Sequence, residues 1–138
     1  MTDYLTLDDV LGLHADVMRR TGFLPAPVRD LVALESAIMR PQMVAHDEGA
    51  DLLTQAMTLM LAISQAQAFA NGNKRTAMFA ALVFLELNGC TFDGDDEVLA
   101  VLLEEAASRP QDEARTTIAE WMRPHIVTQR DQRDTPQP

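Results

Sequence analysis

Cysteine, aromatic residues and basic residues are all scarce in this chain of 138 residues. Cys90 is the only cysteine, which excludes an intramolecular disulfide and favours a reducing compartment. Aromatic residues make up 5% of the chain, and β-branched residues rarely occur in runs. Ala, Leu and Met, which are strong helix formers, are plentiful. The composition therefore predicts an all-α protein.

The shortage of basic residues limits the possible partners. The chain has 11 Lys and Arg against 21 Asp and Glu, which gives a formal net charge of −10. Affinity for nucleic acids comes largely from Lys and Arg that neutralise phosphates, so most of this surface should repel DNA and RNA. We therefore expect a protein or small-molecule partner, although a local basic pocket is compatible with the negative total.

Long apolar runs are absent as well. The longest, Ala77 to Leu85, is far shorter than the ~20 residues that span a bilayer. Residues 1–7 include Asp3 and have neither the basic start nor the apolar centre of a signal peptide. We therefore expect no membrane interaction and a cytoplasmic location.

Apolar residues recur at helical spacing in six segments. The expected helices run from about Leu7 to Gly22, Leu31 to Arg40, Glu48 to Gln67, Asn73 to Asn88, Asp96 to Ser108 and Asp112 to Arg123. Thr6, Asp30 and either Asp95 or Asp96 are suited to be N-caps. Pro41 is expected to end the second helix, and residues 91–95 are expected to form a short turn.

The third and fourth expected helices are apolar around most of their circumference, which predicts a central buried pair. The sequence therefore predicts one helical bundle of about six helices, formed by residues 1–127. Residues 128–138 are polar and include two prolines, Pro136 and Pro138. This composition predicts a disordered tail.

The segment between these two helices, residues 67–77 (QAFANGNKRTA), combines a glycine with two cations. Gly72 leads directly into a helix whose first turn contains Lys74 and Arg75. Cations are disfavoured there, because the first N–H groups of a helix have no acceptors and lie at its positive end. An anion such as phosphate would explain them, and Gly72 would let the backbone approach it. Alternatively, Asn71 or Asn73 only caps the helix and both cations extend into solvent.

The same segment resembles the signature of the Fic/Doc family, His-x-Phe-x-(Asp/Glu/Asn)-Gly-Asn-(Gly/Lys)-Arg. Every specified position fits except the first, where Gln67 replaces the histidine. Lys74, followed by Thr-Ala, is similar to the Doc branch (death-on-curing toxins) rather than to the AMP-transferring Fic proteins. Residues 5–14, 29–41 and 84–89 also resemble Doc segments. The resemblance implies the Fic fold.

The resemblance further implies an ATP-dependent transferase that uses Mg²⁺. Asn71 would help to hold the metal through its amide oxygen, which carries no charge. Gly72 and Asn73, with Asn71, would cradle the phosphates of ATP. Lys74 and Arg75 would bind these phosphates and neutralise their charge in the transition state.

Doc proteins transfer the γ-phosphate of ATP to a threonine of elongation factor Tu and so halt translation. The related Fic proteins transfer AMP instead, and the orientation of ATP decides between the two reactions. Lys74 favours phosphate transfer. The family's built-in inhibitory pattern, Ser/Thr-x-x-x-Glu-Gly/Asn, is absent from the sequence. The resemblance therefore implies inhibition by a separate Phd-type antitoxin.

Gln67 would stand where the family has the histidine that removes the proton from the attacking hydroxyl. An amide has no useful basicity near neutral pH, and losing a general base costs ~10²–10⁴-fold in rate. We expect a chain that binds its substrates but reacts slowly, whether Gln67 is natural or engineered. The alternative is a non-catalytic binding module with the same fold. Phe69 would anchor the loop in the core, and His14 is expected to be structural rather than a replacement base.

Overall fold

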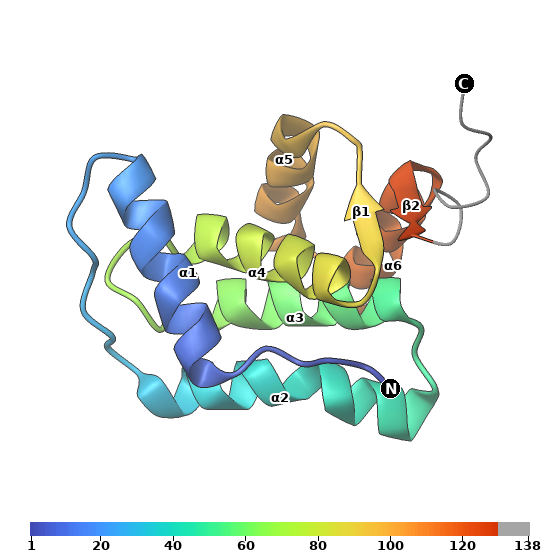
Figure 1. Ribbon diagram of the computed structural model, residues 1–138, viewed down its shortest axis with the longest axis horizontal. Helices are drawn as coiled ribbons and strands as arrows, with labels where there is room; N and C mark the ends of the chain where they lie inside the picture. The colour runs from blue at the N-terminus through green and yellow to red at the C-terminus, as the bar shows by residue number, and fades with distance from the viewer. Residues whose placement is uncertain (130–138) are drawn as a thin grey trace.

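A computed structural model describes residues 1–129 (Figure 1). The helices are α1 (Leu7–Arg20), α2 (Leu31–Glu48), α3 (Leu52–Ala66), α4 (Asn73–Leu87), α5 (Asp96–Ala106) and α6 (Gln111–Met122). A short 3₁₀ helix, η1 (Arg123–His125), joins α6 to the strand β2 (Ile126–Thr128), which pairs with β1 (Cys90–Phe92). The prediction of an all-α bundle of about six helices is confirmed.

Side chains that the sequence indicated as N-caps begin three of the helices. At the start of α1, the Asp9 N–H donates to Thr6 Oγ1 at 3.1 Å and the Thr6 N–H donates to Asp9 Oδ2 at 2.8 Å. Asp30 and Asp95 accept N–H bonds from the first turns of α2 and α5, at 2.9 and 2.8 Å. These N-caps are confirmed.

α2 is longer than predicted, because Pro41 lies inside it and does not end it. A proline within a helix removes one backbone hydrogen bond and crowds the preceding turn, at a cost of about 3 kcal/mol. Here the buried face of the helix continues across the proline, from Leu34 and Ile38 through Pro41 to Val44. Packing of this face against α3 therefore outweighs the lost hydrogen bond.

The start of α3 also differs from the prediction, which placed it at Glu48. Glu48 is the last residue of α2, and Gly49 ends that helix with a φ of 65°. α3 begins only after Asp51, whose side chain accepts the N–H of Thr54 at 2.8 Å. Gly49 and Asp51 thus end α2 and begin α3 within a few residues. The spacing of the apolar residues did not show where one helix ends and the next begins.

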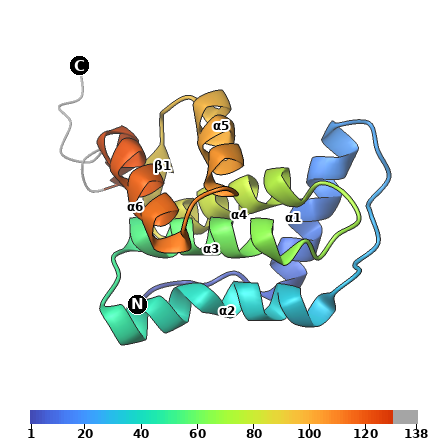
Figure 2. The same ribbon diagram turned by 180° about the vertical axis from the view of Figure 1, so that it is seen from behind.

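α3 lies at the centre of the molecule, with α2 on one side and α4 on the other (Figures 1 and 2). Ten of its fifteen residues are buried, as its apolar circumference predicted. α1 packs against α4, and α6 packs against α3, so the other helices assemble around the central pair α3 and α4. No helix in residues 1–129 has both the length and the apolar character needed to cross a membrane.

The two strands form a small sheet that the sequence did not predict. They are antiparallel, with Cys90 opposite Thr128 and Phe92 opposite Ile126. The first strand occupies part of the expected turn at residues 91–95. Thr128, which the sequence placed in the tail, belongs to β2, and Gln129 follows it. The expected tail from residue 130 on lies outside the described residues. Strands of three residues carry too little periodicity to be recognised.

Candidate active site

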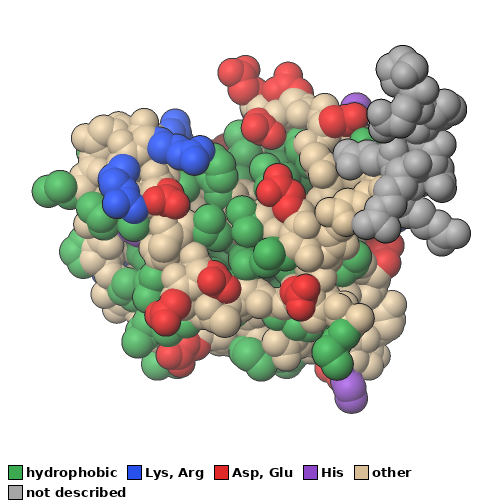
Figure 3. Space-filling view, viewed as in Figure 1, with side chains coloured by type: hydrophobic (Ala, Val, Ile, Leu, Met, Phe, Trp, Pro, Cys, Tyr) green, Lys and Arg blue, Asp and Glu red, His purple; other side chains and the backbone are tan. Residues whose placement is uncertain are grey.

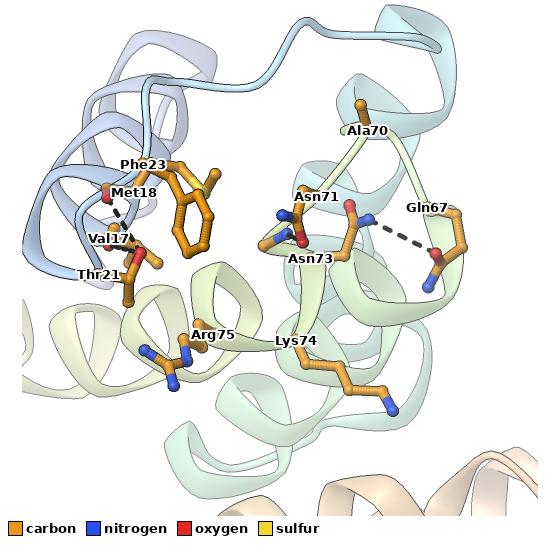
Figure 4. A pocket seen from close by; sticks show the side chains of 11 residues that line it. Val17, Met18, Thr21, Phe23, Gln67, Ala70, Asn71, Asn73, Lys74 and Arg75 are labelled. Atoms are coloured by element: carbon orange, nitrogen blue, oxygen red, sulfur yellow. Dashed lines mark hydrogen bonds between the residues drawn. The ribbon is translucent and has the colours of Figure 1, made fainter.

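The loop between α3 and α4 borders a cleft of about 450 Å³ (Figure 4). One wall is this loop with the first turn of α4, and the other is the end of α1 with the residues after it. The cleft is lined by Val17, Met18, Thr21, Phe23, Gln67, Ala70, Asn71, Gly72, Asn73, Lys74 and Arg75. Of the site residues that the sequence indicated, all except Phe69 line this one cleft.

Phe69 is buried and anchors the loop, as expected. Its ring stacks on the imidazole of His14, with centroids 3.7 Å apart and an angle of 5° between the planes. His14 is 2% exposed, and its Nε2 donates to the carbonyl of Asn71 at 3.0 Å. The structural role expected for His14 is therefore confirmed: it holds the loop against α1.

Asn73 is also buried, and its side chain is hydrogen-bonded to the backbone of the same loop. Its Oδ1 accepts the N–H of Phe69 at 3.0 Å, and its Nδ2 donates to the carbonyl of Phe69 at 2.9 Å. Both ends of the amide are thus used to fix the backbone. Any contact between Asn73 and a phosphate would have to come from its backbone N–H.

Gly72 is the N-cap residue of α4 and has a φ of 79°. The backbone angle favours glycine, and a Cβ at this position would lie 2.8 Å from Sδ of Met18, so a larger residue would displace the Met18 side chain. No side chain caps α4. Asn71 Oδ1 instead accepts the N–H of Gly72 at 2.8 Å. The interpretation that Asn71 or Asn73 caps the helix is therefore wrong, and the first N–H groups of α4 have no side-chain acceptor.

Lys74 and Arg75 extend from the first turn of α4 at the edge of the cleft (Figure 4). Lys74 forms an ion pair with Glu104 of α5, and the two side chains are 43% and 67% exposed. Arg75 is exposed. An ion pair this exposed contributes only about 0–1 kcal/mol, so Lys74 can exchange Glu104 for a more highly charged anion. The arrangement of N–H groups and cations suits a phosphate chain.

The sequence model of the Fic/DOC family matches residues 4–85. The chain belongs to the Fic/DOC family. It is 36% identical over 116 residues to Toxin Doc of Mycolicibacterium smegmatis (strain ATCC 700084 / mc(2)155), which covers 81% of this chain and 86% of that protein. It is 34% identical over 87 residues to Protein kinase doc of Escherichia phage P1, which covers 62% of this chain and 68% of that protein. Both relatives are Doc proteins, which confirms the predicted Doc branch.

Gln67 ends α3 at the first position of the segment that resembles the Fic/Doc signature. Its φ of 49° makes it the only non-glycine residue of positive φ within residues 1–129. Its Nε2 donates to the carbonyl of Ser64 at 2.7 Å, and its Oε1 accepts from Nδ2 of Asn73 at 3.4 Å. The exposed amide is thus bonded to the last turn of α3 and to the side chain of Asn73, at the edge of the cleft.

The segment that follows α1 is joined by backbone hydrogen bonds to the loop between α3 and α4. Val28 and Phe69 form an isolated antiparallel bridge. The N–H of Arg29 donates to the carbonyl of Ala68 at 2.6 Å, and the N–H of Ala70 donates to the carbonyl of Pro27 at 3.2 Å. The two loops are therefore held together, and the cleft has walls of defined shape.

The second wall, formed by Val17, Met18, Thr21 and Phe23, was missed by the sequence analysis. Val17 and Met18 lie on α1, where their spacing indicates only a helix packed on the core, and Thr21 and Phe23 follow the end of that helix. Phe23 offered a signal, because it is an aromatic residue in a loop that contains two prolines. Glu104 was also missed, since nothing in the pattern of α5 distinguishes it from its acidic neighbours.

A metal ion fits this site only together with a ligand. No carboxylate lines the cleft, and residues 1–129 contain no cluster of three or more His, Cys, Asp or Glu that could hold a metal. Asn71 Oδ1 already accepts one hydrogen bond, and its second lone pair can serve a hard cation. Mg²⁺ keeps several waters and often binds through substrate phosphates, so these donors suit Mg²⁺ that arrives with a nucleotide.

Proposed function

We propose that this chain is a Doc-type toxin that transfers the γ-phosphate of ATP to a threonine hydroxyl of elongation factor Tu, and that Gln67 slows this reaction. The main support is the start of α4, which opens into the cleft at Gly72 without a side-chain cap and carries Lys74 and Arg75. The relatives named Toxin Doc and Protein kinase doc support the reaction class.

Phosphate binding is the part of the reaction for which this chain is best equipped. The phosphates of ATP would accept hydrogen bonds from the first N–H groups of α4. Lys74 and Arg75 would neutralise the charge that spreads over the transferred phosphoryl group. Lys74 would leave Glu104 as the phosphates arrive, since that exposed ion pair is weak.

Proton removal is the weak part. The hydroxyl oxygen of the target threonine forms a bond to the γ-phosphorus while the bond to the β,γ-bridging oxygen breaks, and ADP leaves. Gln67 Oε1 can accept a hydrogen bond from this hydroxyl but cannot hold its proton, which passes to water. A missing general base predicts a rate ~10²–10⁴-fold below that of a histidine enzyme.

Mg²⁺ bound to the nucleotide would neutralise phosphate charge and align the leaving group. Asn71 is the residue of this chain that would contact it, through Oδ1. The expected affinity of the chain for Mg²⁺ alone is low, because an uncharged amide oxygen is a weak ligand on its own.

A Phd-type antitoxin is the proposed inhibitor. The sequence has no built-in inhibitory pattern of the family. A groove of about 250 Å³ lies between α1 and α4, and its lining includes the apolar Leu13 and Leu82 and the acidic Asp16 and Glu86. Hydrophobic side chains also gather in the middle of the face shown in Figure 3. A disordered antitoxin segment could fold into such a groove by burying its own apolar side chains.

Restoring the histidine tests the proposed reaction. Gln67→His and the unchanged chain are incubated with elongation factor Tu and ATP labelled at either the α or the γ phosphorus. We expect the histidine variant to transfer γ label ~10²–10⁴-fold faster than the unchanged chain. Lys74→Ala in the histidine background is the matched control and should bind ATP weakly.

Each result has a distinct meaning. Transfer of α label would replace the kinase proposal with AMP transfer. No transfer by a folded histidine variant that still binds ATP would overturn both reactions and favour a binding module with the same fold. Unchanged ATP affinity in the Lys74→Ala variant would contradict the assignment of the phosphates to the start of α4.

A further inference from the structure

The wall of the cleft opposite α4 has no role in the function proposed above. Phe23 stands on this wall, and its ring projects into the space that separates α1 from Asn71 and Asn73 (Figure 4). The ring is 60% exposed, and Phe23 is not part of the hydrophobic core. A large aromatic side chain that is mostly exposed within a cleft offers a free face to a ligand.

The backbone fixes the place of Phe23. Its N–H donates to the carbonyl of Met18 at 2.9 Å, which ties it to the last turns of α1. Gly22 turns the chain immediately before it with a φ of 81° and donates to the carbonyl of Arg19 at 3.1 Å. The ring therefore starts from a defined point at the edge of the cleft, and ordering it on a ligand costs little backbone entropy.

The surroundings of the ring offer apolar contact and few polar groups. Val17 and Met18 are buried beside it and have no side-chain N–H or O–H donor. The hydroxyl of Thr21 is directed to its own helix, where it donates to the carbonyls of Val17 and Met18 at 3.1 and 3.0 Å. This wall suits the flat face of an aromatic ligand and has little capacity to read its polar edge.

We infer that Phe23 is a stacking platform for the nucleobase of the bound nucleotide, opposite the phosphate-binding start of α4. The inference rests on the proposed function, because it places the base of the same nucleotide. A cleft of about 450 Å³ is of the size that holds such ligands, which fill pockets of roughly 300–1,000 Å³. Stacking depends on the face of a base, so ATP and GTP should bind alike.

Calorimetric titration with ATP and with inorganic tripolyphosphate tests this inference, because the second ligand has the phosphates without the base. We expect the unchanged chain to bind ATP more tightly than tripolyphosphate. Phe23→Ala should lower the affinity for ATP about tenfold and leave the affinity for tripolyphosphate unchanged. Phe23→Trp should retain ATP binding, and Phe23→Leu, which keeps apolar bulk without an aromatic face, should lose much of it.

Leu24→Ala is the matched control, since Leu24 is 87% exposed and does not line the cleft. It should leave both affinities unchanged. If Phe23→Ala lowered the affinities for ATP and for tripolyphosphate equally, the inference would be overturned, and the role of Phe23 would be to maintain the structure of its loop. Equal affinities of the unchanged chain for the two ligands would overturn it while keeping the phosphate site. If the unchanged chain bound neither ligand, the assignment of a phosphate site to the start of α4 would be wrong, and the inference that rests on it would fail as well.

Discussion

Gly72 satisfies two constraints at once, one from its backbone angle and one from the side chain of Met18. Its φ of 79° lies in the left-handed region, where a Cβ is unfavourable, and a Cβ would also come within 2.8 Å of Sδ of Met18. This closeness is useful as well as restrictive, because it brings the start of α4 against α1 and so narrows the cleft. Backbone conformation and cleft shape thus depend on one missing methyl group.

A pair of alanine variants separates these two constraints. Gly22 has nearly the same φ, 81°, but a Cβ there meets nothing within 4 Å. Gly22→Ala should therefore lower the free energy of unfolding by about 1–2 kcal/mol for the backbone alone. Gly72→Ala should lower it by roughly 1–3 kcal/mol more, because Met18 must move. Urea unfolding measures both; equal losses would show that the approach to Met18 has no energetic importance.

The candidate site was predictable only where its residues follow one another in the chain. Gln67 and residues 71–75 form a short segment whose glycine and cations indicate anion binding, and the structure brings them into one cleft. Phe23 and Glu104 come from distant segments, so no spacing connects them to the loop. Asn73 shows a second limit: its residue type suggested a contact with phosphate or a cap, whereas its buried amide is bonded to the backbone of Phe69.

Helix starts were easier to predict than helix ends. Thr6, Asp30 and Asp95 cap their helices because an N-cap requires one oxygen at one position, a requirement that the sequence displays directly. Pro41 was misleading because its effect depends on what the rest of the helix packs against. The intrinsic cost of a proline is visible in the sequence, but the burial that offsets it exists only in the folded molecule.

Asp51 caps α3 with a carboxylate whose pKa is lower than usual. Burial opposes its ionisation, but hydrogen bonds from the side chain and backbone of Thr54 and the Arg123 guanidinium together outweigh this effect. The folded pKa therefore lies below the unfolded value of about 3.9. The stability from this charge is present above about pH 3.9 and is lost as the pH falls through the folded pKa.

Asp51→Asn should accordingly have a pH-dependent effect. Asparagine remains a good N-cap but carries no charge, so the variant should lose about 0.5–1 kcal/mol at neutral pH. This difference should shrink toward zero as the pH falls below about 3.9, where the unchanged chain loses the same charge. Urea unfolding across this pH range measures it. Asp51→Ala also removes the N-cap oxygen, so its free energy of unfolding should be lower by a further ~0.5–2 kcal/mol at every pH. If the loss in Asp51→Asn did not change with pH, the charge of Asp51 would not be the source of that stability.

The two ends of α4 have different functions in the molecule. Its first turn forms the cleft, while both ends of the described chain meet at its last turn and the strand beyond it (Figure 1). On the N-terminal side, the N–H of Asp3 donates to Asn88 Oδ1 at 2.8 Å, and Asn88 Nδ2 donates to the carbonyl of Asp3 at 2.9 Å. On the C-terminal side, β2 pairs with β1. The contacts that hold the two ends of the described chain therefore lie at one end of α4, and the candidate active site lies at the other.

This separation predicts that removing β2 weakens the fold and spares the site. A chain that ends at His125 loses the β1–β2 pairing and the bond from the N–H of Gln129 to the carbonyl of Gly89, which is 2.8 Å long. Backbone hydrogen bonds contribute about 0.5–1.5 kcal/mol each, so its free energy of unfolding should fall by roughly 1–3 kcal/mol relative to a chain that ends at Gln129. The affinity for ATP, measured well below the unfolding temperature of both chains, should be the same, because the cleft lies at the opposite end of α4. Equal unfolding midpoints would show that β2 adds no stability, and a fall in affinity with folding intact would show that the two ends of α4 are coupled.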